Sequence, residues 1–188
     1  MGFGASLSSA YARRLDIINR GFAGYNTDWG LPILKQLLPT IKEQTEDPSK
    51  IEFMTIFFGA NDSGLPIAKA HVPIERYRDN LTTMVAMIKD THSPYYNPGI
   101  RLVLITPPPV DEVKWKERCE GQGDELNRTN ENARLYAEVV KQVAKEHDII
   151  AIDAWSHFMG LDHHLSEFQV DGLHLNHKGN QVKSFLEP

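Results

Sequence analysis

The sequence predicts an α/β fold, a three-layer α/β/α sandwich around a parallel sheet. Three observations predict it: short apolar runs rich in β-branched residues, longer amphipathic stretches, and the alternation of the two along the chain. Alternating strands and helices form right-handed βαβ units whose helices cover both faces of the sheet. The chain has 188 residues, the length of one ordinary domain, so residues 1–188 are expected to fold as a single unit.

The predicted strands are apolar runs bounded by polar or turn-forming residues. Three of them read as buried strands: Ile51 to Phe58, Ile100 to Ile105, and Asp148 to Ile152. A shorter run, Leu15 to Ile18, leads into a glycine-containing turn, as a strand leading into a loop would. It is predicted to be a further strand.

The predicted helices fill the stretches between these runs. They are Asp28 to Glu43, Pro73 to Lys89, and Gly123 to Glu146. The last stretch carries apolar residues at intervals of about three and four on an otherwise charged background, which is typical of a helix with one buried face.

Composition narrows the classes of partner. The hydrophobic share of 41% and the charged share of 24% are typical of a globular protein. The net charge of -5 argues against nucleic acid as a partner. No apolar window suggests a signal peptide or a membrane span, so a cytoplasmic location is expected, with a homodimer left open. The single cysteine, Cys119, lies in a polar stretch and is expected to be an exposed thiol.

Polar blocks follow the predicted strands, where parallel sheets bind their ligands. They are Asn19 to Thr27, Gly59 to Asp62, and Thr106 to Asp111, with Asp171 to His174 as a further block near the C-terminus. We therefore expect a site for a small molecule at this edge of the sheet.

Four residues in these blocks have types suited to acyl transfer. Asp171, three residues before His174, can accept the Nδ1 proton of the imidazole and leave Nε2 free to act as a base; a surface or capping role is the alternative. Asn61 offers an amide suited to stabilising an oxyanion, or else forms a turn or helix cap. Gly24 allows a backbone N–H to approach a ligand, or only permits a tight turn.

The order and spacing of these blocks resemble the SGNH hydrolase family, also called GDSL esterases and lipases. The segments that carry the resemblance are RGFAGYNT at 20–27, FFGAND at 57–62, TPPPVD at 106–111 and DGLHLN at 171–176. They are most similar to the isoamyl acetate-hydrolysing esterases within that family. The resemblance covers nearly the whole chain and implies a flavodoxin-like SGNH hydrolase fold.

The resemblance also implies a function and a role for each residue. The function is hydrolysis of small, short-chain carboxylic esters, such as acetate esters, through an acyl-enzyme, with no cofactor and no metal. His174 is implied to be the base and Asp171 its orienting partner, while Gly24 and Asn61 are implied to be the oxyanion donors.

One block of the family has no match. The Gly-Asp-Ser block, which supplies the nucleophile and ends the first, central strand, is absent, and the opening Met1 to Ser6 resembles the family's first helix. Ser6, Ser8 and Ser9 lie on that candidate helix and not in a turn after a strand. We therefore expect a chain truncated at its N-terminus, and also shortened at 179–188, that lacks the first central strand and the nucleophile. The alternative is a non-catalytic pseudo-hydrolase that binds esters or acyl groups.

Two other kinds of site are disfavoured. A metal site could draw on a histidine-rich stretch, but the adjacent His163 and His164 cannot easily face one ion; the other members of that stretch are Asp162, His174 and His177. A flavodoxin-like nucleotide site is disfavoured because no glycine-rich phosphate loop follows a strand. Among the tryptophans, Trp115 and Trp155 are expected to be packing residues, and Trp29 lies close enough to the glycine block to border an acyl pocket.

Overall fold

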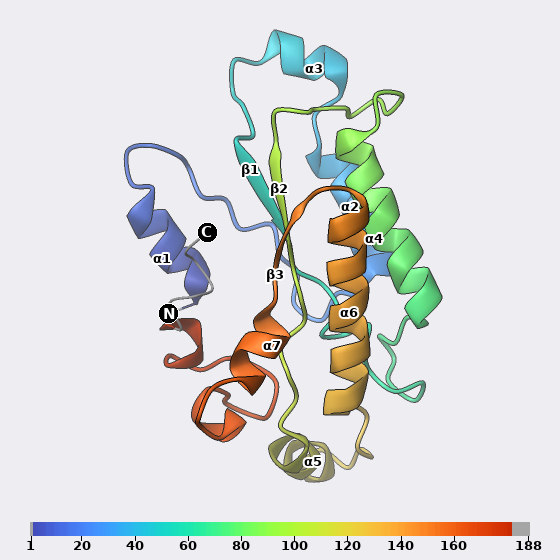
Figure 1. The fold of residues 1–188 in the computed structure, drawn as a ribbon, viewed down its shortest axis with the longest axis vertical. Helices are drawn as coiled ribbons and strands as arrows, with labels where there is room; N and C mark the ends of the chain where they lie inside the picture. Colours follow the sequence, from blue (N-terminus) through green and yellow to red (C-terminus); the bar gives the residue numbers. More distant parts are fainter. Residues whose placement is uncertain (1, 182–188) are drawn as a thin grey trace.

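A parallel sheet lies at the centre of the computed structural model, which describes residues 2–181 (Figure 1). Its strands are β1 (Phe53–Ile56), β2 (Arg101–Ile105) and β3 (Ile150–Ile152), in the order β1-β2-β3. Both pairings are parallel. The strands fall inside the three main apolar runs of the sequence, so the predicted parallel sheet is confirmed.

The middle strand, β2, contributes alternate side chains to two cores. Leu102 and Leu104, at 4% and 0% exposed, belong to the larger core. Val103 and Ile105 belong to a second core on the opposite face. Leu104 lies opposite Ile56 of β1, so the larger core continues across the strand pair.

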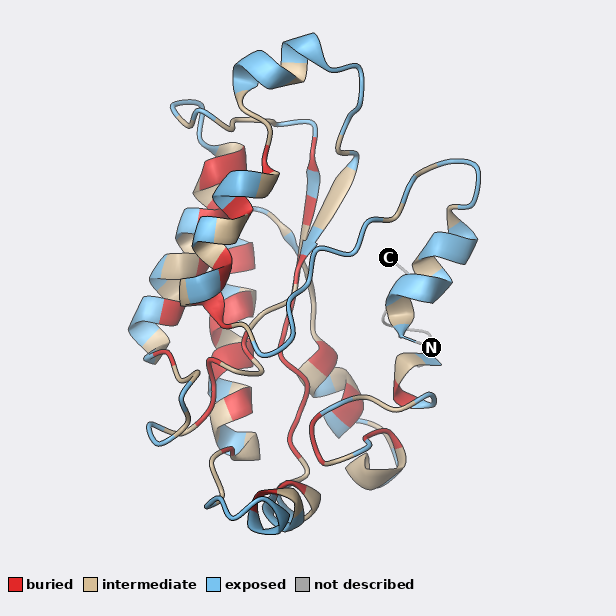
Figure 2. Ribbon diagram, turned by 180° about the vertical axis from the view of Figure 1, so that it is seen from behind, coloured by how far each residue is buried: buried red, intermediate tan, exposed pale blue. Residues whose placement is uncertain are grey.

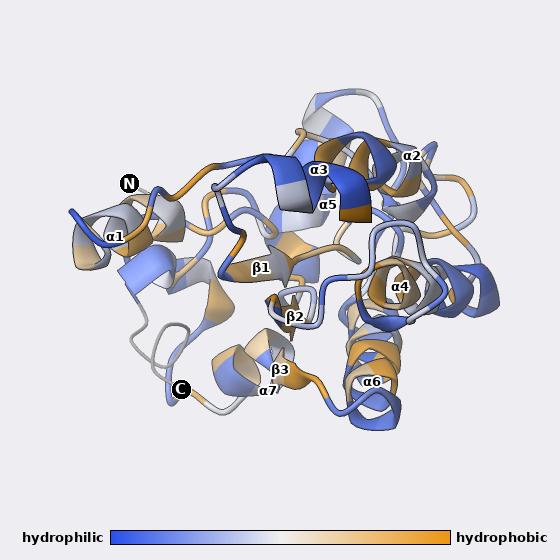
Figure 3. Ribbon diagram, turned by 90° about the horizontal axis from the view of Figure 1, so that it is seen from above, coloured by the Kyte–Doolittle hydropathy of each residue, from blue (hydrophilic) through white to orange (hydrophobic). Residues whose placement is uncertain are grey.

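Three helices cover the face of the larger core: α2 (Thr27–Leu37), α4 (Ile74–Lys89) and α6 (Asn130–Glu146) (Figure 3). The α4 and α6 helices meet through Tyr77 and Tyr136, whose ring centroids are 4.9 Å apart. Their buried residues face the sheet (Figure 2). No helix within residues 2–181 combines the length and the apolar character needed to cross a membrane.

The opposite side of the sheet carries α1 (Phe3–Ala10) and α7 (Ala154–Met159) (Figures 1 and 3). The α1 helix has no buried residue and contacts the sheet side through Phe3, whose ring lies 6.2 Å from that of Phe57. Helices on both faces confirm the three-layer arrangement. The remaining helices are α3 (Ile41–Glu46), α5 (Glu112–Gly121), and the short 3₁₀ turns η1 (Leu165–Glu167) and η2 (Gly179–Gln181).

The predicted helix from Asp28 to Glu43 is wrong in its extent, because it is two helices. The residue before a proline is disfavoured in the helical conformation, and the break falls at Leu38, before Pro39. The second helix starts again at Thr40, which exchanges hydrogen bonds with Glu43 in a capping box.

The predicted helix from Gly123 to Glu146 also begins too early. Thr129 caps α6 by accepting a hydrogen bond from the Asn132 N–H at 3.2 Å, and 123–129 is not helical. The α5 helix was not predicted, because it buries only Trp115 and Cys119 and so has little apolar periodicity. For the same reason the expected exposure of Cys119 is wrong. It lies one turn beyond Trp115 on the inward face of α5 and is 1% exposed.

The predicted strand from Leu15 to Ile18 is also wrong. The segment forms no regular secondary structure, Ile18 is 64% exposed, and within residues 2–181 β1 pairs only with β2. A strand exists only where a neighbour accepts and donates its hydrogen bonds. The expectation about 179–188 falls mostly on 182–188, which lies outside the described residues.

Candidate functional site

The Gly-Ala-Asn-Asp block forms the loop that follows β1. Its Gly59 has a φ of +115°, and a Cβ there would lie 2.7 Å from the Tyr77 hydroxyl and 3.0 Å from Cγ of Pro107. Both the conformation and the close packing therefore require glycine. The Gly59 N–H donates to the Asp62 carboxylate at 3.1 Å, which closes the loop.

The carboxylate of Asp62 joins this loop to the segment before α2. Asp62 is 0% exposed and accepts hydrogen bonds from the Thr27 backbone N–H at 2.8 Å and the Thr27 hydroxyl at 2.6 Å. Burial raises the pKa of Asp62, and the hydrogen bonds from Thr27 and Gly59 oppose that rise. Two segments distant in sequence are thus fixed to each other by one buried group.

The side chain of Asn61 lies between two partners. Its Nδ2 donates to the Tyr25 carbonyl at 2.8 Å, and its Oδ1 accepts from Nη2 of Arg128 at 2.9 Å. Tyr25 directly follows Gly24, so Asn61 is hydrogen bonded to the residue next to Gly24. Gly24 has a φ of +78° with nothing within 4 Å of a would-be Cβ, so the space beside it is open.

The expected hydrogen bond between Asp171 and His174 is present. The carboxylate lies 2.8 Å (Oδ2) and 3.1 Å (Oδ1) from Nδ1 of the imidazole. Oδ1 also accepts from the backbone N–H of His174 at 3.0 Å, so the turn and the ring are oriented together. The His174 side chain is 66% exposed, whereas that of Asp171 is 21% exposed.

The Asp171 carboxylate is stabilised in its charged form. Burial raises its pKa, but hydrogen bonds from the His174 backbone and ring and from the Leu173 N–H outweigh burial, and the pKa lies below its ordinary value. Nε of Arg118 lies 3.1 Å from Oδ2 and adds an ion pair. An ionised Asp171 is the form that holds the Nδ1 proton of His174.

The loop between these two residues is wedged against α5. Gly172 has a φ of +92°, and a Cβ there would lie 2.5 Å from the Asp111 carbonyl oxygen and 2.6 Å from the Trp115 nitrogen. The Asp111 N–H donates to the Gly172 carbonyl at 2.9 Å. The block that ends at Asp111 therefore supports the loop of His174.

Three residues connect the Asn61 part of the site to the Asp171 and His174 part. None of them was expected there from the sequence. The Trp115 ring is 4% exposed and has Arg118 over it at 4.6 Å and Arg128 at 4.9 Å from the ring centroid. Arg118 reaches Asp171 and Arg128 reaches Asn61. The spacing of three between Trp115 and Arg118 was a local signal; nothing local pointed to Arg128.

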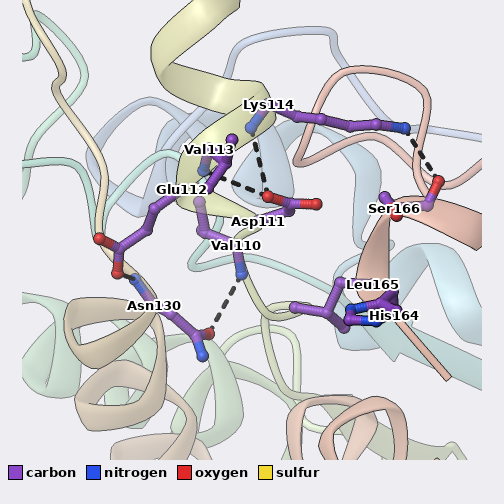
Figure 4. Close-up of a pocket in the computed structure, with 9 residues that line it drawn as sticks. All are labelled: Val110, Asp111, Glu112, Val113, Lys114, Asn130, His164, Leu165 and Ser166. Atoms are coloured by element: carbon purple, nitrogen blue, oxygen red, sulfur yellow. Dashed lines mark hydrogen bonds between the residues drawn. The ribbon is translucent and has the colours of Figure 1, made fainter.

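A hollow of about 520 Å³ lies beside the α5 N-terminus (Figure 4). None of the four expected site residues lines it. Two of its polar side chains already bond within the protein: Lys114 donates to the Ser166 carbonyl at 2.9 Å, and Asn130 Oδ1 accepts from the Val110 N–H at 3.1 Å. The residues lining it are Val110, Asp111, Glu112, Val113, Lys114, Asn130, His164, Leu165 and Ser166.

The histidine-rich stretch does not converge on one point. Nδ1 of His163 lies 3.3 Å from Glu167, while Nδ1 of His174 faces Asp171. Among residues 2–181, no three His, Cys, Asp or Glu side chains form a group that could hold a metal ion.

The three N-terminal serines lie on α1, as the sequence predicts. Ser6, Ser8 and Ser9 are exposed on this helix. The hydrogen bonds of the His174 ring within the described residues all go to Asp171. No described serine is therefore hydrogen bonded to Nε2 of His174.

Comparison with solved structures establishes the fold. A lipase/acylhydrolase from Enterococcus faecalis superposes with a TM-score of 0.66 at 23% identity, over 97% of this chain and 78% of that chain. At this identity the likeness concerns the fold alone.

Comparison of sequences is more specific. An isoamyl acetate-hydrolyzing esterase 1 homolog of Bos taurus is 41% identical over 190 residues, which cover 100% of this chain and 73% of the relative. A GDSL esterase/lipase of Arabidopsis thaliana is 37% identical, over 96% of this chain and 74% of the relative. The GDSL-like lipase/acylhydrolase family matches residues 2–182. The chain therefore belongs to the GDSL-like lipase/acylhydrolase family.

Proposed function

We propose that the site serves the hydrolysis of small, short-chain carboxylic esters, with acetate esters as the best candidates. His174 is the base, Asp171 orients it, and the Gly24 N–H and the Asn61 amide receive the oxyanion. Family membership and the relatives support an ester hydrolase. The finer assignment of roles rests on the geometry of the described residues.

The hydrogen bond between Asp171 and His174 carries the proposal. Because an ionised carboxylate only accepts, the shared proton belongs to Nδ1, and in the neutral ring Nε2 then has the lone pair. This is the tautomer in which a histidine takes a proton from an attacking hydroxyl or water. The His174 side chain is 66% exposed, so an incoming ester has access to the ring.

The oxyanion side is supported by one unused donor. One N–H of the Asn61 amide goes to the Tyr25 carbonyl, and no described residue accepts the other. A carboxamide N–H held in place and left unpaired is suited to a developing negative charge. Nothing lies within 4 Å of a would-be Cβ of Gly24, so that side of its backbone is open to a ligand.

An aromatic surface next to this donor supports a small apolar acyl or alcohol group. The rings of Phe22, Tyr25 and Trp29 lie in sequence, with centroids 4.9 Å and 5.8 Å apart. Phe22 and Trp29 are 52% and 44% exposed. The Bos taurus relative is named for hydrolysis of isoamyl acetate, an ester that combines an acetyl group with a short apolar chain.

The described serines do not supply the nucleophile. We infer that none of the described serines attacks the ester, because none is hydrogen bonded to His174 and Ser6, Ser8 and Ser9 lie exposed on a helix. This observation favours a second candidate, a pseudo-hydrolase that binds esters or acyl groups. Both candidates use the same carbonyl site and differ only in turnover.

One experiment separates binding from turnover. The chain of 188 residues is expected to hydrolyse p-nitrophenyl acetate without a burst and no faster than His174→Ala, with no serine labelled by a fluorophosphonate probe. Any remaining hydrolysis would be direct attack by water, assisted by the oxyanion donors. His177→Ala, which changes an exposed histidine on the same segment, is the matched control.

Binding is followed by NMR. Methyl isoamyl ketone keeps the acetyl carbonyl and the isoamyl chain but has no ester bond, and it is expected to shift the amide signals of Gly24 and Asn61. If neither the Gly24 nor the Asn61 amide signal shifts, the proposed carbonyl site is wrong. Labelling at Ser6, Ser8 or Ser9 that His174→Ala abolishes would show that a described serine is the nucleophile.

A further inference from the structure

We propose that Arg128 is a positioning residue that fixes the orientation of the Asn61 amide, with Trp115 as the surface that holds Arg128 in place. The catalytic meaning of this inference rests on the proposed function, in which Asn61 receives the oxyanion. The orientation itself is a property of the folded chain.

Arg128 is a buried cation with no described carboxylate at ion-pair distance. It is 9% exposed, and within residues 2–181 it forms no ion pair with Asp or Glu. Nε is buried and has no hydrogen-bond partner among the described residues. Burying a charge in this way is unfavourable unless other contacts compensate for it. The contacts around the guanidinium must therefore offset this cost.

The contacts of Arg128 come from three sides. Its Nη2 donates to Asn61 Oδ1 at 2.9 Å, and its guanidinium carbon lies 4.9 Å from the centroid of the Trp115 ring. Its Nη1 lies 3.1 Å from where a Cβ of Gly64 would be, so the glycine leaves space for the guanidinium. The head group is therefore confined by a ring on one side and a bare backbone on another.

The chemistry of the guanidinium decides which way the Asn61 amide points. Arginine only donates, so the group that faces Nη2 must be the carbonyl oxygen of the amide. The NH₂ group then faces the Tyr25 carbonyl, which only accepts. A flipped amide would oppose donor to donor at Arg128 and acceptor to acceptor at Tyr25. Both partners select the same orientation, and this orientation leaves one N–H for a ligand.

Trp115 has a second contact that ties this arrangement to the base. Arg118 lies over the same ring at 4.6 Å and forms the ion pair with Asp171 at 3.1 Å. The indole N–H donates to Asn127, the residue before Arg128, at 3.0 Å. The ring therefore supports the orienting groups of both Asn61 and His174.

The test follows the Asn61 side-chain amide by NMR, which needs no turnover. Its signals, assigned by their loss in Asn61→Asp, are expected to have an order parameter near 0.85, about that of rigid backbone. In Arg128→Met, which keeps the length of the stem but removes the donors, the order parameter should fall below about 0.6. Arg128→Lys, which retains a donor, should restore part of the lost order.

Arg134→Met is the matched control, because Arg134 lies on α6 and, among the described residues, forms its ion pair with Glu131. It should leave the Asn61 amide unchanged. A mobile Asn61 amide in the unsubstituted protein would overturn the proposal. A rigid Asn61 amide in folded Arg128→Met would also overturn it. If a form with turnover is studied, Arg128→Met should lower kcat by about 10² to 10³-fold with a smaller change in KM.

The two proposals can fail separately. If the Asn61 amide loses order in Arg128→Met but methyl isoamyl ketone leaves the Gly24 and Asn61 signals of the unsubstituted protein unshifted, the positioning role stands and the proposed function is wrong. If the ketone binds at Gly24 while the order of the Asn61 amide is unchanged in Arg128→Met, the proposed function stands and the positioning role is wrong.

Discussion

The loop after β1 and the loop of Asp171 and His174 lie at the same candidate site but are held in different ways. Asp62 is 0% exposed and accepts hydrogen bonds from residues up to 35 positions away, whereas His174 is held by a carboxylate three positions away and has a side chain 66% exposed. The first loop is part of the core, and the second carries its reactive group on the surface. Substitutions in the first should therefore affect folding, and those in the second should affect chemistry first.

The largest effect is expected for Asp62→Ala. The change leaves the Thr27 N–H, the Thr27 hydroxyl and the Gly59 N–H without their acceptor in a buried place. Unsatisfied buried donors cost about 1 to 3 kcal/mol each, and we expect a loss of about 3 to 5 kcal/mol in the free energy of unfolding by urea titration. Asp16→Ala, on an exposed aspartate, is the control and should change it by less than about 0.5 kcal/mol. Equal losses would mean that the buried carboxylate does not hold the loops together.

A smaller loss is expected for Gly172→Ala, which tests whether the exposed loop has a buried anchor. The new methyl group would meet the backbone of Asp111 and Trp115 at 2.5 and 2.6 Å, in a conformation with φ +92°. We expect a loss of about 2 to 3 kcal/mol in thermal or urea unfolding. Gly24→Ala has a similar φ of +78° but open space, and should cost about 1 kcal/mol. A Gly172 variant no less stable than the Gly24 variant would show that the wedge against α5 contributes little.

The smallest effect is expected for Asp171→Asn, and it depends on pH. Because the folded-state pKa of Asp171 is lowered from 3.8, its charge stabilises the fold above about pH 4, and this contribution is lost as the pH falls through the folded pKa. With a side chain 21% exposed and screened by solvent, the loss at pH 7 should be about 1 kcal/mol. Urea unfolding of both proteins at pH 7 and pH 3 should give a difference that shrinks at the lower pH. A difference that grows toward pH 3 would reverse the sign of the linkage.

The sheet and the Asp171 and His174 pair could be predicted because their signals are local. The β-branched runs mark β1, β2 and β3, and a spacing of three brings a carboxylate to an imidazole. The strand at Leu15 to Ile18 could not be judged locally, since a strand depends on a neighbour that the run itself does not specify.

The role of Arg128 could not be predicted for a related reason. Its partner Asn61 is 67 positions away, and a buried arginine with no described carboxylate at ion-pair distance runs against the expectation from residue type. The α5 helix escaped prediction because two buried residues make a weak periodic signal. Contacts between distant segments, more than local propensities, therefore complete this site.

The reactivity of the buried Cys119 thiol can report the opening of α5. Cys119 is the single cysteine of the sequence, is 1% exposed, and packs in the same core cluster as Trp115 and Leu173. A thiol reagent can reach it only when α5 lifts from the molecule, so in the limit of fast reclosing the alkylation rate reports the population of that opened form. One unmodified side chain thus allows the fraction of molecules in which the support beneath both arginines has opened to be measured in the native protein.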